Sequence, residues 1–298
     1  MCTQRVLGAF ASLLLLLAGG HFLLEATEAG FVQHFGVHLS YRKGLNMSTV
    51  PGSEPGELVT TVRTTTEAPI ELLPPSSEPY KFAQPLSDMH RSQFAQDRSL
   101  EPLLSPIKNG FFVESGAFDG ESISNTVYLE SLGWQGLLIE PSPNYKNIVQ
   151  KHRKAWVFHG ALSPDGTSQM LHFRFGGPLG FADPSAKTEV PAEPLWKLLK
   201  SIDPKRNTVD FWSLDVDGSE CGVLKGTDFT KVVVGVMLIE MNKNAQNNLC
   251  IKEVMKAKGF KDIGKLAIDS VFVNETYFQN LGLAVPEKIK DMNGKPAS

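Results

Sequence analysis

The sequence is poor in the residues that most often build an easily recognised site. It has only three cysteines, Cys2, Cys221 and Cys250, which excludes a disulfide-rich scaffold and a cysteine-built zinc site of ordinary spacing. Its formal net charge is −3, so composition offers no electrostatic basis for a nucleic-acid partner. The seven histidines are scattered and belong to no Ser–His–Asp or Cys–His order. A dinucleotide G-x-G-x-x-G fingerprint is also missing.

An almost uncharged apolar segment covers residues 6–24, close to the ~20 residues that span a bilayer. One interpretation is a signal-anchor transmembrane helix with residues 1–5 as a short cytosolic tail, which Arg5 favours. The other is a signal peptide cleaved near Ala29, although Thr27 makes a poor −3 residue. Both place the remainder in the secretory pathway. The first predicts a lumenal domain at the endoplasmic reticulum, Golgi, endosome or plasma membrane, and the second predicts secretion.

The next region is rich in Ser, Thr and Pro and poor in aromatic residues, so it cannot bury enough apolar surface to fold. We predict a disordered stem over residues 25–99, a folded domain over 100–285 and a flexible tail over 286–298. Asn46 and Asn274 each begin an N-glycosylation sequon. In a lumenal domain Cys221 and Cys250 could pair, but the sequence leaves this open.

The stretch around which the domain is organised is Phe111–Gly120. An apolar run without polar alternation indicates a strand buried on both faces, and it ends at Glu114. Gly116 and Gly120 then allow a tight turn and close approach of the backbone to a ligand. A helix is predicted over residues 124–132, ended by Gly133. A strand, a glycine turn and a helix in this order are typical of a nucleotide-type site.

A second buried strand, residues 136–140, ends in Glu140 and is followed by an amphipathic helix that Ser142 and Pro143 begin. A carboxylate at this strand end can accept two hydrogen bonds from a ribose diol. Further strands are predicted over residues 155–162, 169–175, 209–214, 232–240, 260–267 and 270–274, and helices over 195–202 and 248–258. Residues 176–192 are expected to form a loop.

Three blocks in this order resemble the FkbM-type S-adenosylmethionine-dependent methyltransferases: FFVESGAFDGE, GLLIEPSPNYKNIVQKHRKAWVFHGALSP and VDFWSLDVDGSECGVLKG. The resemblance covers roughly residues 105–275 and is closest to the animal branch that includes the insect membrane protein Star. It implies an α/β fold of the class I methyltransferase type. This is a three-layer sandwich with a mostly parallel seven-stranded sheet and an antiparallel C-terminal hairpin.

The resemblance also implies S-adenosylmethionine as cofactor and a set of site residues. Asp215 and Asp217 are the candidate catalytic residues, Asp215 as a base or as a group that orients the acceptor. The alternative is an acidic strand end that caps the next helix. The expected cofactor-binding residues are Glu114, Gly116, Ala117, Asp119, Gly120, Glu140, Pro141, Gly160 and Ala161. Phe118 departs from the small polar residue that is common in the family and could crowd the cofactor.

Asp215, Asp217, Glu240 and Asn242 are oxygen ligands of the kind that Mg²⁺ or Ca²⁺ prefers. The resemblance does not require a metal, so the prediction includes none.

Two functions are compatible with these observations. One is an O-methyltransferase of the secretory pathway acting on a small-molecule, glycan or lipid hydroxyl. The other is a non-catalytic, Star-like membrane factor that helps growth-factor precursors, a protein cargo, to travel from the endoplasmic reticulum to the Golgi.

Overall fold

The computed structural model describes residues 11–17, 20–26, 31–34, 37–40, 70–176, 179–241 and 244–296, and the chain forms two compact units, Met1–Pro69 and Ile70–Ser298. The described part of the first unit consists of two antiparallel hairpins. One pairs β1 (Ala11–Leu17) with β2 (Gly20–Ala26), and the other pairs β3 (Phe31–His34) with β4 (Val37–Ser40). Among the described residues, no helix is both long and apolar enough to cross a bilayer.

The sequence predicts one helix over residues 6–24, whereas the described parts of this segment are strands. Leu17 of β1 pairs with Gly20 of β2. Gly20 is disfavoured in a helix interior. Residues 1–5 and Asn46 lie outside the described residues. The membrane anchor and the signal peptide therefore stay predictions.

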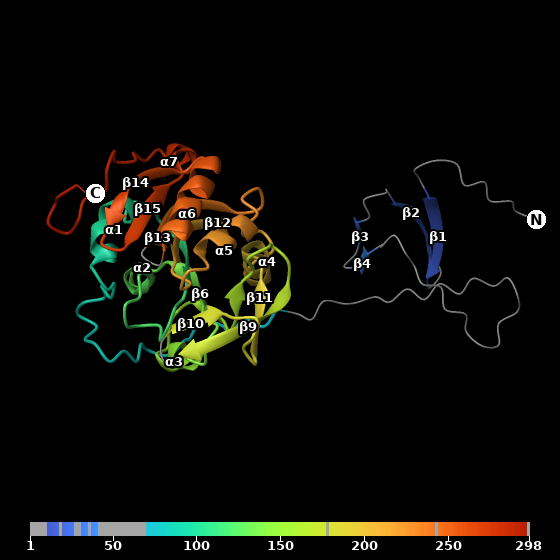
Figure 1. Cartoon of the computed structure of the whole chain (residues 1–298), viewed down its shortest axis with the longest axis horizontal. Helices are drawn as coiled ribbons and strands as arrows, with labels where there is room; N and C mark the ends of the chain where they lie inside the picture. Colours follow the sequence, from blue (N-terminus) through green and yellow to red (C-terminus); the bar gives the residue numbers. More distant parts are fainter. Residues whose placement is uncertain are drawn as a thin grey trace, which may run out of the picture. The chain divides into compact units, whose positions relative to one another are not determined.

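The second unit is built on a seven-stranded sheet in the order β14-β15-β13-β12-β5-β6-β7 (Figure 1). The strands are β5 (Phe111–Ser115), β6 (Gln135–Ile139), β7 (Trp156–Phe158), β12 (Thr208–Leu214), β13 (Val233–Glu240), β14 (Lys261–Leu266) and β15 (Asp269–Val273). Five neighbouring strands from β13 to β7 are parallel, and β15 runs antiparallel to both β13 and β14. The predicted mostly parallel sheet with a C-terminal antiparallel hairpin is confirmed.

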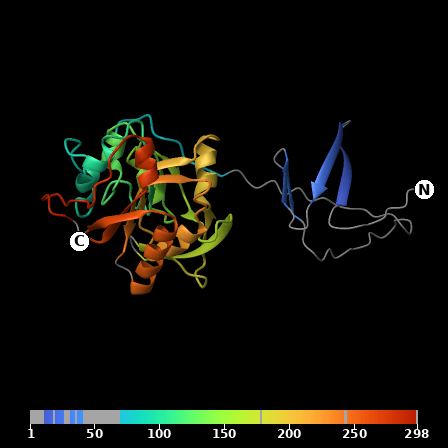
Figure 2. The same ribbon diagram turned by 90° about the horizontal axis from the view of Figure 1, so that it is seen from above.

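Helices cover both faces of this sheet, as Figure 2 shows from a second direction. One apolar cluster packs α4 (Leu195–Ile202), α5 (Glu220–Gly226) and α6 (Ala245–Ala257) against one face. The other packs α1 (Gln96–Leu104), α2 (Val127–Ser131), α3 (Tyr145–Gln150) and α7 (Glu275–Asn280) against the opposite face. Alternate residues of β5 divide between the two: Phe111 and Val113 join the first cluster and Phe112 the second. A strand apolar on both sides is therefore the centre of three layers.

A second, four-stranded sheet has the order β10-β9-β11-β8 and was not expected. Its strands are β8 (Ala161–Leu162), β9 (Gln169–Gly176), β10 (Leu179–Ala182) and β11 (Thr188–Glu193). The prediction of a loop over residues 176–192 is wrong, because β10 and most of β11 lie there. In β11 only Val190 and Ala192 are buried, at strand period. Two alternating residues beside Pro191 are too weak a signal to identify a strand from sequence.

The predicted boundaries of the folded domain are also corrected. Residues from Ile70 onward belong to the compact unit, so the disordered stem does not extend to residue 99. Leu73 pairs with Val157, and the buried Glu121 carboxylate accepts hydrogen bonds from the amides of Ala83 and Gln84. Composition describes only the segment itself, and by that measure the segment is predicted to be disordered. It cannot reveal a hydrogen-bond partner that lies 37 or 38 residues away. In the predicted flexible tail, Ile289 is buried and its amide donates to the Ile263 carbonyl.

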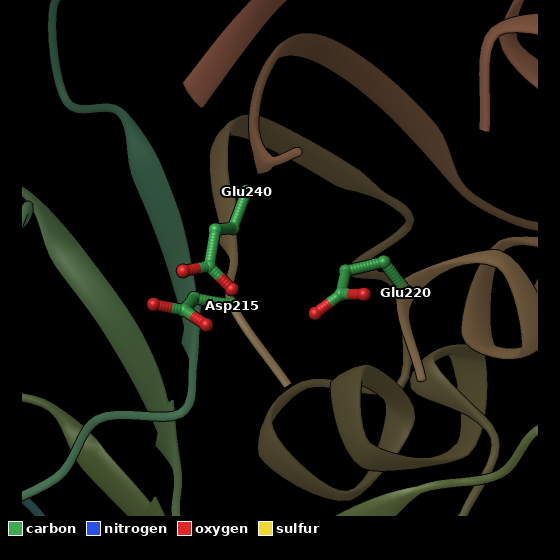
Figure 3. A group of neighbouring side chains, drawn as sticks. All are labelled: Asp215, Glu220 and Glu240. Carbon is green, nitrogen blue, oxygen red and sulfur yellow. The ribbon is translucent and has the colours of Figure 1, made fainter. Parts of the chain in front are cut away.

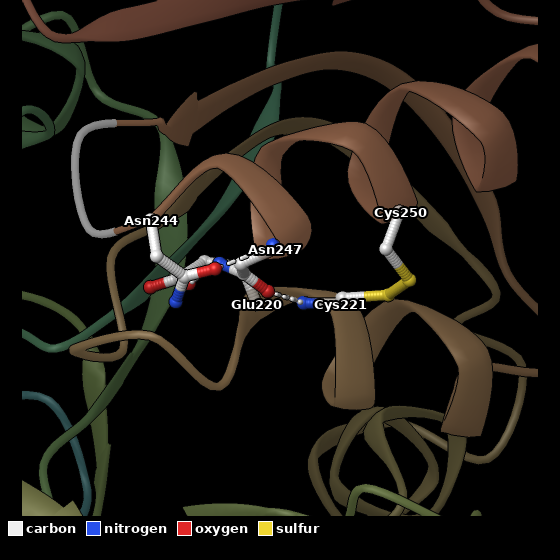
Figure 4. Close-up of a disulfide and its surroundings, with 5 residues drawn as sticks. All are labelled: Glu220, Cys221, Asn244, Asn247 and Cys250. Carbon is white, nitrogen blue, oxygen red and sulfur yellow. Dashed lines mark hydrogen bonds between the residues drawn. A yellow bond between two sulfur atoms is a disulfide. The ribbon is translucent and has the colours of Figure 1, made fainter.

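Cys221 and Cys250 form a disulfide that joins α5 to α6, with their Cα atoms 5.9 Å apart (Figure 4). Beside it, the Asn247 side chain donates to the Glu220 carboxylate at 2.7 Å. The same side chain accepts a hydrogen bond from the Cys221 amide. The pairing that the sequence left open is thus present, and it fixes the helix that follows β12.

Replacing both cysteines by alanine should lower the free energy of unfolding by about 3.5 kcal/mol, the loop-entropy value for the 29-residue separation. Urea unfolding with and without reductant measures this. Reduction should lower the free energy of unfolding of the natural chain by a similar amount. The free energy of unfolding of the double variant should not change with reductant. Equal stabilities of the oxidised natural chain and the double variant would contradict the prediction.

Candidate functional site

The loops after the central strands begin at one edge of the sheet. The register pairs Ser115, the last residue of β5, with Ile139 of β6 and with Leu214 of β12. Glu240, the last residue of β13, lies one position further along. Ligands of open α/β sheets bind outside this carboxyl edge.

A cavity of about 500 Å³ lies at this edge, within the range of small-molecule sites. Four carboxylates line it: Glu140, Asp215, Asp217 and Glu240. No lysine, arginine or histidine is among the described residues that line it. The cavity therefore favours a ligand with positive rather than negative charge.

Gly116 brings two of the loops into direct contact. Its φ is +85°, and a Cβ atom there would lie 1.9 Å from the Asp215 carbonyl oxygen. Only glycine fits, because the obstacle is backbone and cannot move aside. The amides of Gly116 and Ala117 both donate to the Ile139 carbonyl. The predicted glycine turn is confirmed, and its first amides fix the loop against β6.

Glu140 lies at the cavity wall, where the sequence predicts it. Its carboxylate is buried and accepts hydrogen bonds from the amides of Phe118 and Ser142, each at 2.8 Å. Burial raises its pKa, against the lowering effect of these hydrogen bonds. The Ser142 side chain is a third hydrogen-bond partner, so of the roughly four lone-pair sites of the carboxylate about one is left for a ligand.

Glu114 does not line the cavity, although the sequence predicts that it binds cofactor. Its buried carboxylate accepts hydrogen bonds from the hydroxyls of Ser124 and Thr126 at 2.8 and 2.7 Å, and from the Asn125 amide at 2.7 Å. Burial raises its pKa, while the charge of Arg153 and these hydrogen bonds lower it. The structure thus places Glu114 where it holds the end of the loop that starts at Gly116.

Arg153 is the residue at the centre of this loop that sequence reasoning missed. It is 2 % exposed, and its Nε donates to the Glu130 carboxylate at 3.0 Å. Its two terminal nitrogens donate to the Gly120 carbonyl at 2.6 Å and the Thr126 hydroxyl at 2.9 Å. Nothing in the sequence marks it, because its partners are 23 to 33 residues away.

The other predicted cofactor-binding residues divide into two groups. Pro141 and Ala161 line the cavity, whereas Ala117, Asp119, Gly120 and Gly160 do not. The last three have structural contacts instead. Asp119 accepts the amides of Glu121 and Ser122, a Cβ at Gly120 would touch Ile148, and Gly160 packs against Phe158.

Asp215 and Asp217, the predicted catalytic pair, both line the cavity. Asp217 has a left-handed backbone (φ +53°), and its carboxylate accepts a hydrogen bond from the Gly180 amide of β10 at 3.3 Å. This contact connects the second sheet to the loop after β12.

Figure 3 shows the Asp215 and Glu240 carboxylates beside each other, with Glu220 turned toward them from α5. Ligand atoms of the three lie within 4.8 Å of one another, an arrangement that could hold a metal ion. The metal alternative weighed from sequence had Asp217 and Asn242 instead of Glu220. Asn242 lies outside the described residues. Glu220 is fully buried and already braces the loop by accepting the amides of Val216 and Gly218.

Phe118, which was expected to crowd the site, does line it, and its amide donates to Glu140. Other lining residues could not be identified from sequence. Gln93 comes from the segment predicted as stem, and Leu171 and Phe173 from β9. Ile123 has a left-handed backbone (φ +59°) that is rare for a β-branched residue, and its side chain is 49 % exposed. These residues reach the cavity through tertiary contacts that no local pattern reports.

Replacing Arg153 by methionine should lower the free energy of unfolding by about 3–5 kcal/mol, because Glu130 would be left as a buried, unpaired charge. Arg98→Met removes an exposed ion pair with Asp88 and should cost under about 1 kcal/mol. Urea unfolding of both variants measures the difference. Equal losses would mean that the buried pair does not hold the loop.

The strand order, the antiparallel β15 and the site at the carboxyl edge define a protein with a class I methyltransferase-like fold. The methyltransferase FkbM domain matches residues 114–262, half of the chain, and the chain belongs to this family. The predicted family resemblance is confirmed, and the Star-like branch stays a prediction.

A crystal structure of a proposed O-methyltransferase from Klebsiella pneumoniae is similar to this chain with a TM-score of 0.35 and 12% sequence identity. The match covers 63% of this chain and 83% of that one. No curated protein was found to match.

Proposed function

We propose that the domain is an S-adenosylmethionine-dependent O-methyltransferase whose cofactor binds in the cavity at the carboxyl edge. The observation that carries this proposal is the charge of the lining: four carboxylates and, among the described residues, no basic side chain. S-adenosylmethionine bears a cationic sulfonium, a cationic amino group and one carboxylate, so its net positive charge suits the lining. A cofactor with several phosphates would find no cation there to pair with.

The residues present fit this cofactor. Glu140 lines the cavity at the strand end where a carboxylate binds a ribose, and it is held in place by the Phe118 and Ser142 amides. Pro141, Ala161 and the buried Leu162 provide an apolar wall suited to an adenine ring. Gly116 keeps the loop backbone close to Asp215.

When bound, the cofactor supplies a methyl group to an acceptor oxygen; the carbon–sulfur electron pair stays on sulfur, and the hydroxyl proton leaves to a base. Asp215 is the residue that we assign as this base, because it lines the cavity at the end of β12. Asp217 orients the neighbouring wall by accepting the Gly180 amide. Proximity and orientation of this kind contribute most of the catalysis available to such a transfer.

The disulfide supports a location in the secretory pathway, because disulfides persist in oxidising compartments. We therefore propose that the domain is lumenal, anchored by residues 6–24 or secreted after their cleavage, with glycans on Asn46 and Asn274. The Asn274 side-chain oxygen caps α7 by accepting the Tyr277 amide, and its nitrogen would carry the glycan. Glycosidase treatment with protease protection tests this: a domain digested from the cytosolic side would refute it.

A second candidate function is the non-catalytic, Star-like export of a growth-factor precursor. One observation favours it: Asp217, a predicted catalytic residue, serves as a brace between two loops. In that case the fold would be a scaffold and its partner a protein cargo.

Titration calorimetry on the full chain with its disulfide formed separates the two. S-adenosylmethionine should bind saturably. Glu140→Gln should weaken binding about 10- to 100-fold, because the amide nitrogen that replaces one carboxylate oxygen cannot accept a hydrogen bond from a ribose hydroxyl. Glu253→Gln on the exposed face of α6 is the matched control and should bind like the natural chain. A folded natural chain that binds no cofactor would favour the scaffold role.

A further inference from the structure

The second sheet gives the cavity an apolar wall, in contrast to the carboxylates at its acidic edge. In β9 the side chains alternate: Leu171 and Phe173 face the cavity, while Met170, His172 and Arg174 are exposed. Leu171 and Phe173 pack with the buried Ala161, Val190 and Ala192 in a separate apolar cluster. This wall is therefore rigid and unable to form side-chain hydrogen bonds.

The sheet that carries the wall has β8, with Ala161 of the proposed adenine wall, at one edge and β10 at the other. β9, which carries Leu171 and Phe173, pairs directly with β10. The Gly180 amide of β10 contacts the Asp217 carboxylate, which places the sheet against the loop after β12, next to Asp215. The ribose-binding Glu140 lies instead after β6, on the other side of β5 in the sheet. Val216, Val223 and Ile268 also line the cavity.

Neutral polar groups are scarce around this space. Apart from the four carboxylates, the described lining residues include only two with polar side chains, Gln93 and Ser219. A sugar lying along the wall of Leu171 and Phe173 would lose the water bound to its hydroxyls and find no side-chain partner on that wall, which costs free energy for each hydroxyl.

The size of the cavity limits what can enter. About 500 Å³ accommodates one drug-sized molecule, so a bound cofactor leaves room for only the reacting end of an acceptor. The half-exposed Ile123 and the exposed Gln93 mark the mouth through which the remainder would pass.

We propose that the methyl acceptor is a hydroxyl carried on an apolar hydrocarbon skeleton, bound along the wall formed by Leu171 and Phe173, and not a glycan. This rests on the proposed methyltransferase function and selects one class from the hydroxyl-bearing acceptors that the sequence allows.

The test uses the full chain and four probes: S-adenosylhomocysteine, 1-hexanol, 1-octanol and methyl β-glucoside. The chain is first titrated with S-adenosylhomocysteine, and the saturated complex is then titrated with each alcohol and with the glucoside. Because each buried CH₂ group tightens binding about fourfold, 1-octanol should bind about 15-fold more tightly than 1-hexanol. The glucoside should bind more weakly than either.

Variants test whether the tight binding of 1-octanol depends on the wall formed by Leu171 and Phe173. Leu171→Gln should weaken 1-octanol binding about tenfold, whereas Met170→Gln, the next residue and 53 % exposed, should not change it. Ile123→Asn provides a second test at the mouth, because asparagine tolerates the left-handed backbone and should preserve the fold. It should also weaken 1-octanol binding. All three variants should bind S-adenosylhomocysteine as the natural chain does.

The outcomes separate the two proposals. If S-adenosylhomocysteine does not bind, the methyltransferase function fails, and the acceptor proposal fails with it. If it binds but hexanol and octanol bind equally, or the glucoside binds best, the function stands and the apolar acceptor is refuted. Equal weakening by Leu171→Gln and Met170→Gln would also refute it, because the effect would not come from the cavity face.

Discussion

The buried ion pair between Arg153 and Glu130 holds the loop on which the site depends. A guanidinium without solvent is costly unless its donors are satisfied, and Arg153 satisfies them with a carboxylate, a carbonyl and hydroxyl groups. Through Gly120 and Thr126 it fixes the middle and the end of the loop that follows β5. The start of the same loop is fixed separately, by the Gly116 and Ala117 amides on the Ile139 carbonyl.

Buried glutamates also hold loops in place around the carboxyl edge of the sheet. Glu114, Glu121, Glu140 and Glu220 each accept backbone amides from a loop that would otherwise have unpaired donors. Such loops are organised before any ligand arrives, which lowers the entropy cost of binding. Three of the four, Glu114, Glu121 and Glu220, brace the structure without lining the cavity, while Glu140 braces and lines it. An acidic residue near a strand end is therefore a sign of loop bracing as often as of ligand binding.

This explains what could be predicted from sequence. The apolar runs of β5, β6, β12 and β13 and the turn at Gly116 are local signals, and they were sufficient for the fold and for placing Glu140, Asp215 and Asp217 at one edge. Glu114 carries the same local signal as Glu140, but its neighbours Ser124 and Thr126 turn it inward. Arg153 and the segment from Ile70 to Gln93 depend on partners distant in sequence, so no local pattern contained them. β9 was predicted as a strand over residues 169–175, but its place at the cavity was not.

The central claim is that the braced cavity binds the cofactor with its ribose at Glu140. A crystal structure of the full chain with S-adenosylhomocysteine tests it most directly. The account predicts the ribose hydroxyls within hydrogen-bonding distance of the Glu140 carboxylate, with the adenine beside Pro141 and Ala161. A ligand bound elsewhere, or a ribose directed away from Glu140, would contradict it.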